Sequence, residues 1–150
     1  MNIFEFLKQD HEKVAGIFEQ LEPTTERAEK TRAELFARLK AELDLHAYLE
    51  ETILYPVLKQ EEQTREIALE GVEEHRVVKR LLKELDEMPV TSEQWTAKLT
   101  VLKENVEHHV EEEEGEMFKK ARAALSREQI ESLTTRFESE KTQQKAAARS

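Results

Sequence analysis

Residues 39–56 read LKAELDLHAYLEETILYP. The apolar residues in this segment recur every three or four positions, which is the spacing of a helix with one apolar face. His46 and Glu50 are four positions apart and lie on that face, between Leu43 and Ile53. The segment therefore predicts a helix that turns an imidazole and a carboxylate inward together with its apolar side chains.

The composition extends this prediction to the whole chain. Only three of the 150 residues are Gly and three are Pro, while 37% are charged. So few helix breakers in a chain rich in Glu, Lys, Leu and Ala favour long helices. An all-β fold, which needs many turn residues, is excluded. No uninterrupted apolar run is long enough to span a membrane.

The missing cysteine and the negative charge exclude several kinds of site and partner. Without cysteine there is no disulfide, iron–sulfur cluster or thiolate metal site. A formal net charge of -10 disfavours nucleic acid, because the phosphate backbone would repel the chain. No signal peptide is read at the N-terminus. We expect a cytoplasmic protein, a monomer or weak homodimer, with neither nucleic acid nor membrane among its partners.

Apolar spacing and breakers divide the chain into five predicted helices. Four of them cover about residues 2–21, 26–60, 64–87 and 93–125, and the fifth begins near residue 126. Hydroxyl caps are offered by the turn Pro23-Thr24-Thr25, by Thr91 or Ser92, and by Ser126. Thr91 with Gln94 and Ser126 with Gln129 match capping boxes. Pro56 should kink the second helix, because it removes a backbone donor.

Short loops between four long helices predict an all-α fold, an up-down-up-down four-helix bundle. The bundle would occupy residues 1–125 as one domain. Residues 126–150 would add a short C-terminal helix with one narrow apolar stripe. From about Lys141 to Ser150 the chain is polar and is expected to fray.

An internal repeat relates the first two helices to the next two. His46 follows His11 by 35 residues, and His109 follows His75 by 34. An acidic residue directly precedes the first His of each unit, and a Glu follows the second His four positions later. Two helical hairpins with the same polar layout would therefore face each other about a pseudo-twofold axis.

The repeated His and Glu side chains have the spacing of metal ligands. A His and a Glu four residues apart can reach one metal ion, or the carboxylate can bridge two. Burying two ionised carboxylates without partners costs several kcal/mol each, and a cation removes that cost. Without one, the two like charges should raise the pKa of one carboxyl group. The six predicted metal ligands are His11, His46, Glu50, His75, His109 and Glu113.

Each part of this pattern has an ordinary explanation when it stands alone. A single His on an apolar face is usually a core residue bonded to a neighbour, and spaced His/Glu pairs are common on Glu-rich helices. The coincidence of four inward His and two inward Glu in a repeated layout favours a metal site. The alternative is a metal-free helical interaction domain, in which the six side chains satisfy one another as a polar layer.

A competing pair, His108 and Glu112, lies one residue out of register with His109 and Glu113. The helix face through His108 is much more polar than the face through His109. We therefore predict that His109 and Glu113 point inward, while His108 lies at the rim of the site.

The whole pattern resembles the hemerythrin-like, or HHE cation-binding, domain family over about residues 1–125. The residues that carry the resemblance are Asp10-His11, His46 with Glu50, Glu51 and Leu54-Tyr55-Pro56, Glu74-His75, and His109 with Glu113, Glu114 and Met117-Phe118. The resemblance implies a bundle that holds two iron ions in a non-haem di-iron centre with an oxo or hydroxo bridge. The four His would be terminal ligands, Glu50 and Glu113 would bridge the irons, and O₂, NO or peroxide would bind exchangeably.

The chain departs from the oxygen-carrying hemerythrins at two ligands. Their third helix has a second His where this chain has Lys79, and their fourth helix uses an Asp where this chain has Glu113. Fewer imidazoles favour redox, NO or peroxide chemistry, iron handling or sensing over O₂ storage. We expect a binding protein, with weak peroxide or NO chemistry at the di-iron centre as the alternative. Lys79 is expected near the site, where its charge would offset the carboxylates. Tyr48, Tyr55 and Trp95 are expected to be packing residues, with a hydrogen bond from Tyr55 or Glu51 to the site as the alternative.

Two other classes of metalloprotein fail on spacing. A ferritin-like di-iron oxidase needs Glu-x-x-His pairs, and no His in this chain follows a Glu by three residues. A zinc metalloprotease needs His-Glu-x-x-His, which is absent. Zinc or manganese in place of iron remains an alternative, because mixed nitrogen and oxygen ligands suit all three metals.

Overall fold

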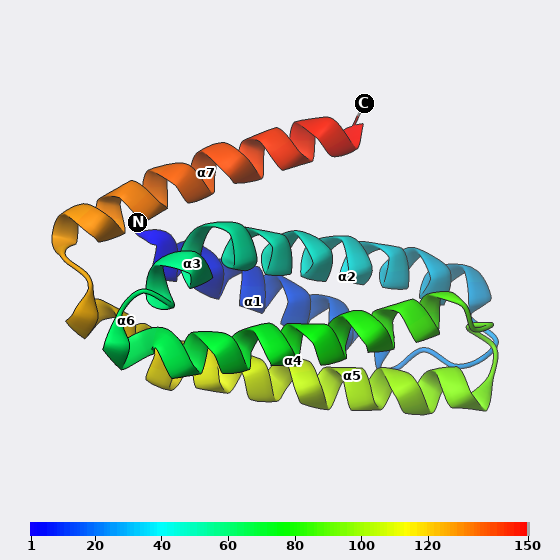
Figure 1. Cartoon of the computed structure of the whole chain (residues 1–150). Coiled ribbons are helices and arrows are strands. Elements are labelled where there is room, and N and C mark those ends of the chain that lie inside the picture. The colour runs from blue at the N-terminus through cyan, green and yellow to red at the C-terminus, as the bar shows by residue number, and fades with distance from the viewer. Residues whose placement is uncertain (150) are drawn as a thin grey trace.

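The long helices form an antiparallel bundle in the predicted up-down-up-down order (Figure 1). The computed structural model describes residues 1–149, and no strand occurs among them. The bundle helices are α1 (Ile3–Leu21), α2 (Glu29–Leu49), α4 (Glu62–Asp86) and α5 (Glu93–Glu112). The all-α class and the bundle architecture predicted from the sequence are confirmed.

The caps of these helices agree only in part with the predictions. Ser92 caps α5 by accepting a hydrogen bond from the backbone N–H of Trp95, so the cap lies one residue after the predicted Thr91 box. The start of α2 at Glu29 has no side-chain cap. Thr24 instead accepts a hydrogen bond from the Arg32 side chain, 3.0 Å away. The hydroxyl group of that turn therefore ties a loop to α2 rather than capping it.

Two π-helical turns interrupt the helices near the middle of the bundle. The first, η1 (Glu50–Leu54), joins α2 to α3 (Tyr55–Leu58), and the second, η2 (Glu113–Met117), joins α5 to α6 (Phe118–Ala124). In each turn a backbone N–H bonds the carbonyl of the Glu five residues earlier. The predicted kink at Pro56 is replaced by a widened turn. Proline is not its cause, because Lys119 occupies the matching position in the second half.

The buried apolar residues form two clusters rather than one continuous core. One cluster contains Phe4, Leu49, Leu54, Met117 and Phe118 near the α3 and α6 end. The other cluster packs around Phe18, Leu39, Leu82, Trp95 and Leu102 toward the loops at the opposite end. The His and Glu side chains of the repeat occupy the layer between these clusters, so the apolar ends hold the polar layer away from water.

The C-terminal helix is longer than predicted. Helix α7 spans Arg127–Arg149, with Leu133 and Phe137 buried against the bundle, and its far end extends away from the other helices (Figure 1). The predicted Ser126–Gln129 capping box is confirmed. The predicted fraying from Lys141 is wrong as far as Arg149, which is helical. Ser150 lies outside the described residues.

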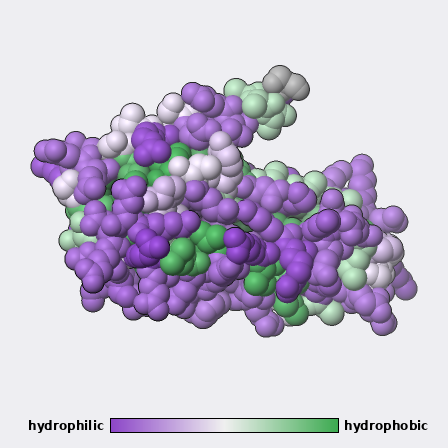
Figure 2. Space-filling model, in the orientation of Figure 1, coloured by the Kyte–Doolittle hydropathy of each residue, from purple (hydrophilic) through white to green (hydrophobic). Residues whose placement is uncertain are grey.

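Hydrophilic residues cover most of the face shown in Figure 2. None of the helices within residues 1–149 combines the length and the apolar character needed to cross a bilayer. This finding agrees with the absence of a long apolar run in the sequence.

Candidate metal centre

The structure brings all six predicted ligand residues together in the layer between the two apolar clusters. One His comes from each of the four bundle helices, and one Glu opens each π-helical turn. Both carboxylates are 0% exposed, and none of the four His residues exceeds 7%. The inward residues are His11, His46, Glu50, His75, His109 and Glu113.

Two carboxylates lie between two pairs of imidazoles. On one side, the Nε2 atom of His11 is 3.0 Å from Glu113 Oε1, and the Nε2 atom of His46 is 3.2 Å from Glu50 Oε1. On the other side, His75 Nε2 is 3.0 Å from Glu50 Oε1. Glu50 thus belongs to both groups of potential ligands that the side chains form. This arrangement suits two adjacent ions with a shared carboxylate.

Each imidazole ring is held from behind by a second carboxylate. The Nδ1 atoms of the four rings bond to acidic side chains in the pairs His11–Glu114 (2.7 Å), His46–Asp10 (3.3 Å), His75–Glu51 (2.8 Å) and His109–Glu74 (2.6 Å). An Nδ1–H that donates to a carboxylate leaves the Nε2 lone pair free to bind a cation. The pairs repeat between the two halves, as the pseudo-twofold relation predicts.

The chemistry of this layer fits a metal. The Nε2 atoms of His11 and His46 are only 3.2 Å apart, so in the neutral tautomers two lone pairs face each other. Glu50 Oε2, Glu113 Oε1 and His109 Nε2 are buried and make no hydrogen bond of good geometry, although Glu113 Oε1 and His109 Nε2 each lie within about 3 Å of an oppositely charged group. Buried polar atoms in native proteins are rarely left without a partner, and a cation between these atoms would satisfy all of them.

The charges of the metal-free layer are set by its own ion pairs. Burial lowers the pKa of His46, but Glu50, Asp10 and Glu113 raise it well above 6.5. Burial also lowers the pKa of His109, and Glu113 outweighs this effect. Burial raises the pKa of Glu50, as Glu113 does, yet the imidazoles bring it to about 2. The predicted rise of one carboxyl pKa is therefore wrong, because the neighbouring imidazolium charges exceed the repulsion between the carboxylates.

Two residues suspected from the sequence do contact the layer. The hydroxyl of Tyr55 donates to Glu113 Oε2 at 3.0 Å and lies 3.3 Å from Glu50 Oε1. Lys79 pairs with Glu51 at 2.9 Å, so its charge does offset a carboxylate. The position of Lys79 agrees with the expectation, whereas Tyr55, expected mainly as a packing residue, is buried and also hydrogen-bonds the site.

Several contacts at the site were not predicted, among them the carboxylates of Asp10, Glu74 and Glu114 behind the imidazoles. A further one comes from the C-terminal helix. Lys141 of α7 lies 2.6 Å from Asp10 Oδ1, and the other oxygen of Asp10 faces His46. Lys141 falls in the segment that the polar composition predicted to fray. Only the tertiary placement of α7 brings it to the site, and no local sequence signal marks it.

The register of the α5 pair agrees with the prediction. The Glu113 side chain is fully buried, whereas 38% of the Glu112 side chain and 64% of the His108 side chain are exposed. His108 lies 3.5 Å from Glu112 and 3.8 Å from Glu74. This second cluster lies at the rim of the layer, outside the six inward residues.

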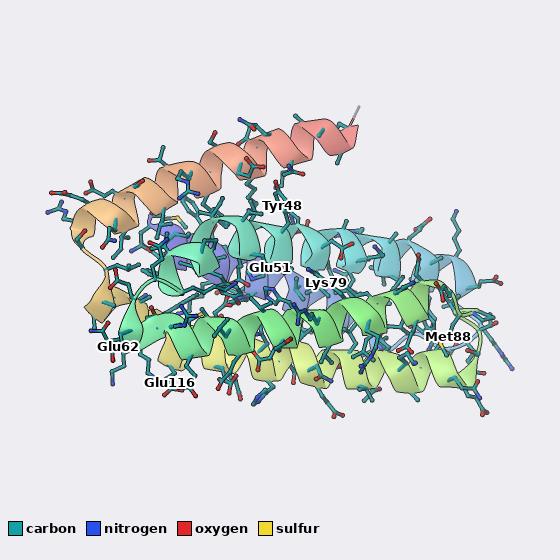
Figure 3. All side chains as sticks on the ribbon, viewed as in Figure 1. Tyr48, Glu51, Glu62, Lys79, Met88 and Glu116 are labelled. Atoms are coloured by element: carbon teal, nitrogen blue, oxygen red, sulfur yellow. The ribbon has the colours of Figure 1, made fainter. Side chains whose placement is uncertain are left out.

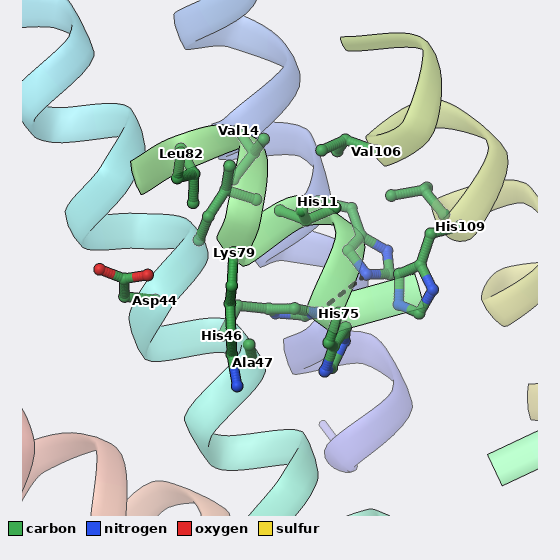
Figure 4. A pocket seen from close by; sticks show the side chains of 13 residues that line it. His11, Val14, Asp44, His46, Ala47, His75, Lys79, Leu82, Val106 and His109 are labelled. Atoms are coloured by element: carbon green, nitrogen blue, oxygen red, sulfur yellow. Dashed lines mark hydrogen bonds between the residues drawn. The ribbon is translucent and has the colours of Figure 1, made fainter. Parts of the chain in front are cut away.

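A small cavity lies beside the four imidazoles. It measures about 30 Å³ and is bordered by His and by Lys79 (Figure 4). This volume accommodates a water molecule, which needs about 10–15 Å³ by the same measure. The apolar side chains around it are Val14, Leu43, Ala47, Val78, Leu82, Val106 and Val110.

The close approach of α4 to Tyr55 predicts opposite effects of two Gly→Ala substitutions on the free energy of unfolding. A Cβ added at Gly71 would lie 2.8 Å from the Tyr55 hydroxyl oxygen, whereas one added at Gly16 would have nothing within 4 Å. Gly71→Ala should displace the hydroxyl from Glu113 and cost roughly 1–3 kcal/mol. Gly16→Ala should stabilise α1 by up to about 1 kcal/mol. Urea unfolding measures both, and an equal gain in the two variants would contradict the expected contact.

Comparison with known proteins places this geometry in a family. The model of the hemerythrin HHE cation-binding domain matches residues 2–121 of the chain. The chain belongs to the hemerythrin HHE cation-binding domain family. As an HHE domain with a buried His and Glu cluster, it is a metal-binding protein.

This HHE domain matches nearly the full length of one relative but less than half of another. A crystal structure of an HHE cation-binding domain-containing protein from Mycobacterium kansasii matches with a TM-score of 0.85 and 25% identity, over 99% of this chain and 90% of that chain. A curated protein named DNA nickase, from Nostoc sp. strain PCC 7120, is 30% identical over 145 residues. That match covers 95% of this HHE domain but only 40% of the relative.

Proposed function

We propose that this HHE domain holds a non-haem di-iron centre that binds O₂, NO or peroxide and serves in redox chemistry, iron handling or sensing. The observation that carries the proposal is the pairing of four inward Nε2 atoms with two carboxylates that have 0% exposure. His11, His46, His75 and His109 would be terminal ligands, and Glu50 and Glu113 would lie between the two ions. When bound, such a centre supplies electron transfer and exchangeable positions for a small ligand.

The surrounding residues support this role in three ways. The Nδ1 carboxylates orient the imidazoles and make them stronger ligands. Tyr55 donates a hydrogen bond at 3.0 Å to a carboxylate oxygen of Glu113 and fixes its orientation. The cavity of about 30 Å³ beside the imidazoles has the size for a diatomic molecule rather than an organic substrate.

Two alternatives remain distinct from this proposal. Zinc or manganese would use the same nitrogen and oxygen ligands. A metal-free interaction domain would keep the six side chains as imidazolium and carboxylate pairs. Nicking of DNA is not part of the proposal, because the net charge of -10 would repel the phosphate backbone.

Metal analysis of the purified protein separates these possibilities. After anaerobic loading of metal-free protein with Fe²⁺, we expect about two ions per chain, as in a two-metal site. Parallel loading with Zn²⁺ and Mn²⁺ ranks the metals, and the visible spectrum before and after reduction, air and NO reports ligand binding. A metal content of zero under every loading condition would contradict the proposal. It would favour the alternative, a metal-free interaction domain in which the six side chains form a polar layer.

A further inference from the structure

Helix α7 lies outside the four-helix bundle, and side-chain contacts fix it to the first two bundle helices. Phe137 is 1% exposed and stacks on Phe6 of α1, with the ring centroids 6.0 Å apart. The hydroxyl of Tyr48 on α2 donates to Glu140 at 2.9 Å, in the space between α2 and α7 (Figure 3). The part of α7 around residues 137–141 is therefore held against both α1 and α2.

At this place α7 reaches the carboxylate behind one of the imidazoles. Lys141 Nζ lies 2.6 Å from Asp10 Oδ1, while Asp10 Oδ2 lies 3.3 Å from Nδ1 of His46. Asp10 is the most buried of the four carboxylates behind the imidazoles, because 8% of its side chain is exposed against 26–27% for the other three. Asp10 therefore has little access to water, and Lys141 and His46 are the partners of its two oxygens.

A buried carboxylate depends on its partners. Without Lys141, the negative charge of Asp10 would keep only the ring N–H of His46, and an incompletely paired charge in a buried position is costly. The Asp10 side chain would then turn toward water and loosen its bond to His46. This bond sets the orientation of the imidazole ring. The aim of His46 Nε2 at a cation therefore depends on Lys141.

The contact acts on one of the two groups of potential ligands. The group that contains His46 consists of His11, His46, Glu50 and Glu113, and the other consists of Glu50, His75 and His109. Helix α7 supplies none of these residues. Through Asp10 it reaches the first group, so its effect should fall on one ion of the pair.

We propose that Lys141 is a positioning residue of the metal centre. By holding Asp10, it fixes the His46 ring and strengthens the binding of the ion in the group that contains His46. The inference rests on the proposed function, because His46 must be a metal ligand. Loss of a partner behind a ligand typically weakens metal binding 10–100-fold. Lys141 acts one residue further out, so its loss should weaken the binding of this ion about tenfold.

The first test compares wild-type protein with Lys141→Met, which removes the ammonium group and keeps an unbranched side chain. Lys145→Met is the matched control, because it makes the same change one turn further along α7. Metal-free proteins, checked for folding by circular dichroism, are titrated with Co²⁺ against a chelator of known affinity. Wild type and control should bind about two ions per chain, and Lys141→Met should hold one of them about tenfold more weakly. Lys141→Arg keeps the charge and should restore most of the affinity.

A double-mutant cycle decides whether Lys141 acts through Asp10. Asp10→Ala should weaken the same ion by at least as much as Lys141→Met does. Adding Lys141→Met to Asp10→Ala should weaken it no further, because the carboxylate that Lys141 holds is already absent. Tyr48→Phe removes a contact between α7 and α2 without touching Asp10, and should leave both ions bound as in wild type.

Proton NMR of the Co²⁺-loaded protein provides a second readout. Ring N–H protons of imidazoles bound to Co²⁺ are shifted far from the usual range, so their exchange with water can be followed ring by ring. In Lys141→Met the N–H of one ring, that of His46, should exchange faster, and the other rings should behave as in wild type. None of the substituted residues borders the cavity beside the imidazoles, so this difference reports the bond to Asp10.

Three results would contradict the inference. Equal Co²⁺ affinities in Lys141→Met and wild type would overturn it and leave the proposed function intact. A further loss on adding Lys141→Met to Asp10→Ala, or an equal loss in Tyr48→Phe, would mean that Lys141 only holds α7 in place. If the wild-type protein took up neither Co²⁺ nor Fe²⁺, the proposed function itself would fail, and the positioning role with it.

Discussion

Glu113→Ala should remove most of the bound metal, whereas Glu112→Ala should leave the final metal content almost unchanged. The Glu113 side chain is fully buried between imidazoles, and that of Glu112 is 38% exposed at the rim. Loss of a hydrogen-bonding partner behind a ligand typically weakens metal binding 10–100-fold, so loss of a ligand between two ions should exceed roughly 100-fold. Metal content after dialysis against a weak chelator measures the difference.

These two variants are matched in chemistry and differ only in register. Circular dichroism of the metal-free proteins should show a folded bundle in both. The opposite ranking, with Glu112→Ala losing the metal, would mean that His108 and Glu112 are the inward pair. It would contradict the burial seen at Glu113.

Bound metal should raise the melting temperature, and by more at pH 7.5 than at pH 5.5. A ligand present at about a thousand times its Kd stabilises the folded state by about 4 kcal/mol. For a chain of this length that corresponds to roughly 10 °C. Ligation requires neutral imidazoles and ionised carboxylates, so the binding contribution weakens as the pH falls.

The metal-free protein should show the reverse trend between these pH values. The pKa values of His46 and His109 are raised above 6.5, so their stabilising contribution is complete below pH 6.5 and is lost as the pH rises. The pKa of Glu50 is lowered from 4.5 to about 2, so its contribution is complete above pH 4.5. The metal-free bundle should therefore be most stable between about pH 4.5 and 6.5.

Thermal unfolding of metal-free and iron-loaded protein at the two pH values measures both trends. Removing iron with a chelator and repeating the scan provides the control for irreversible change. Equal melting temperatures at pH 7.5, with iron confirmed bound, would place the iron on the acidic surface. The six inward side chains would then be an ordinary polar layer.

The fold and the convergence of the six residues follow from local spacing and the repeat. Helical periodicity places His46 and Glu50 on the apolar face, and a repeat of that face in α5 predicts the same for His109 and Glu113. A buried His and Glu can converge only if the helices pack antiparallel in register. Short loops impose that register, so the spacing of the His and Glu residues along the chain is enough to predict that they converge.

Features that depend on contacts between distant segments could not be predicted. The bond from Lys141 to Asp10 joins residues 131 positions apart, and nothing in a polar C-terminal stretch indicates which helix it will meet. The π-helical turns were missed because Glu50 and Glu113 lie within unbroken helical periodicity. Their widened hydrogen-bond pattern does not depend on Pro56, because the second half has Lys119 at the matching position.

The two π-helical turns also give the two halves a common local geometry at the carboxylates. Such turns are rare in proteins and occur mostly as single turns inside α-helices, frequently at functional sites. Each turn here begins at a fully buried Glu, in matching positions of the two halves. The same departure from the α-helical pattern therefore presents both carboxylates to the layer of imidazoles.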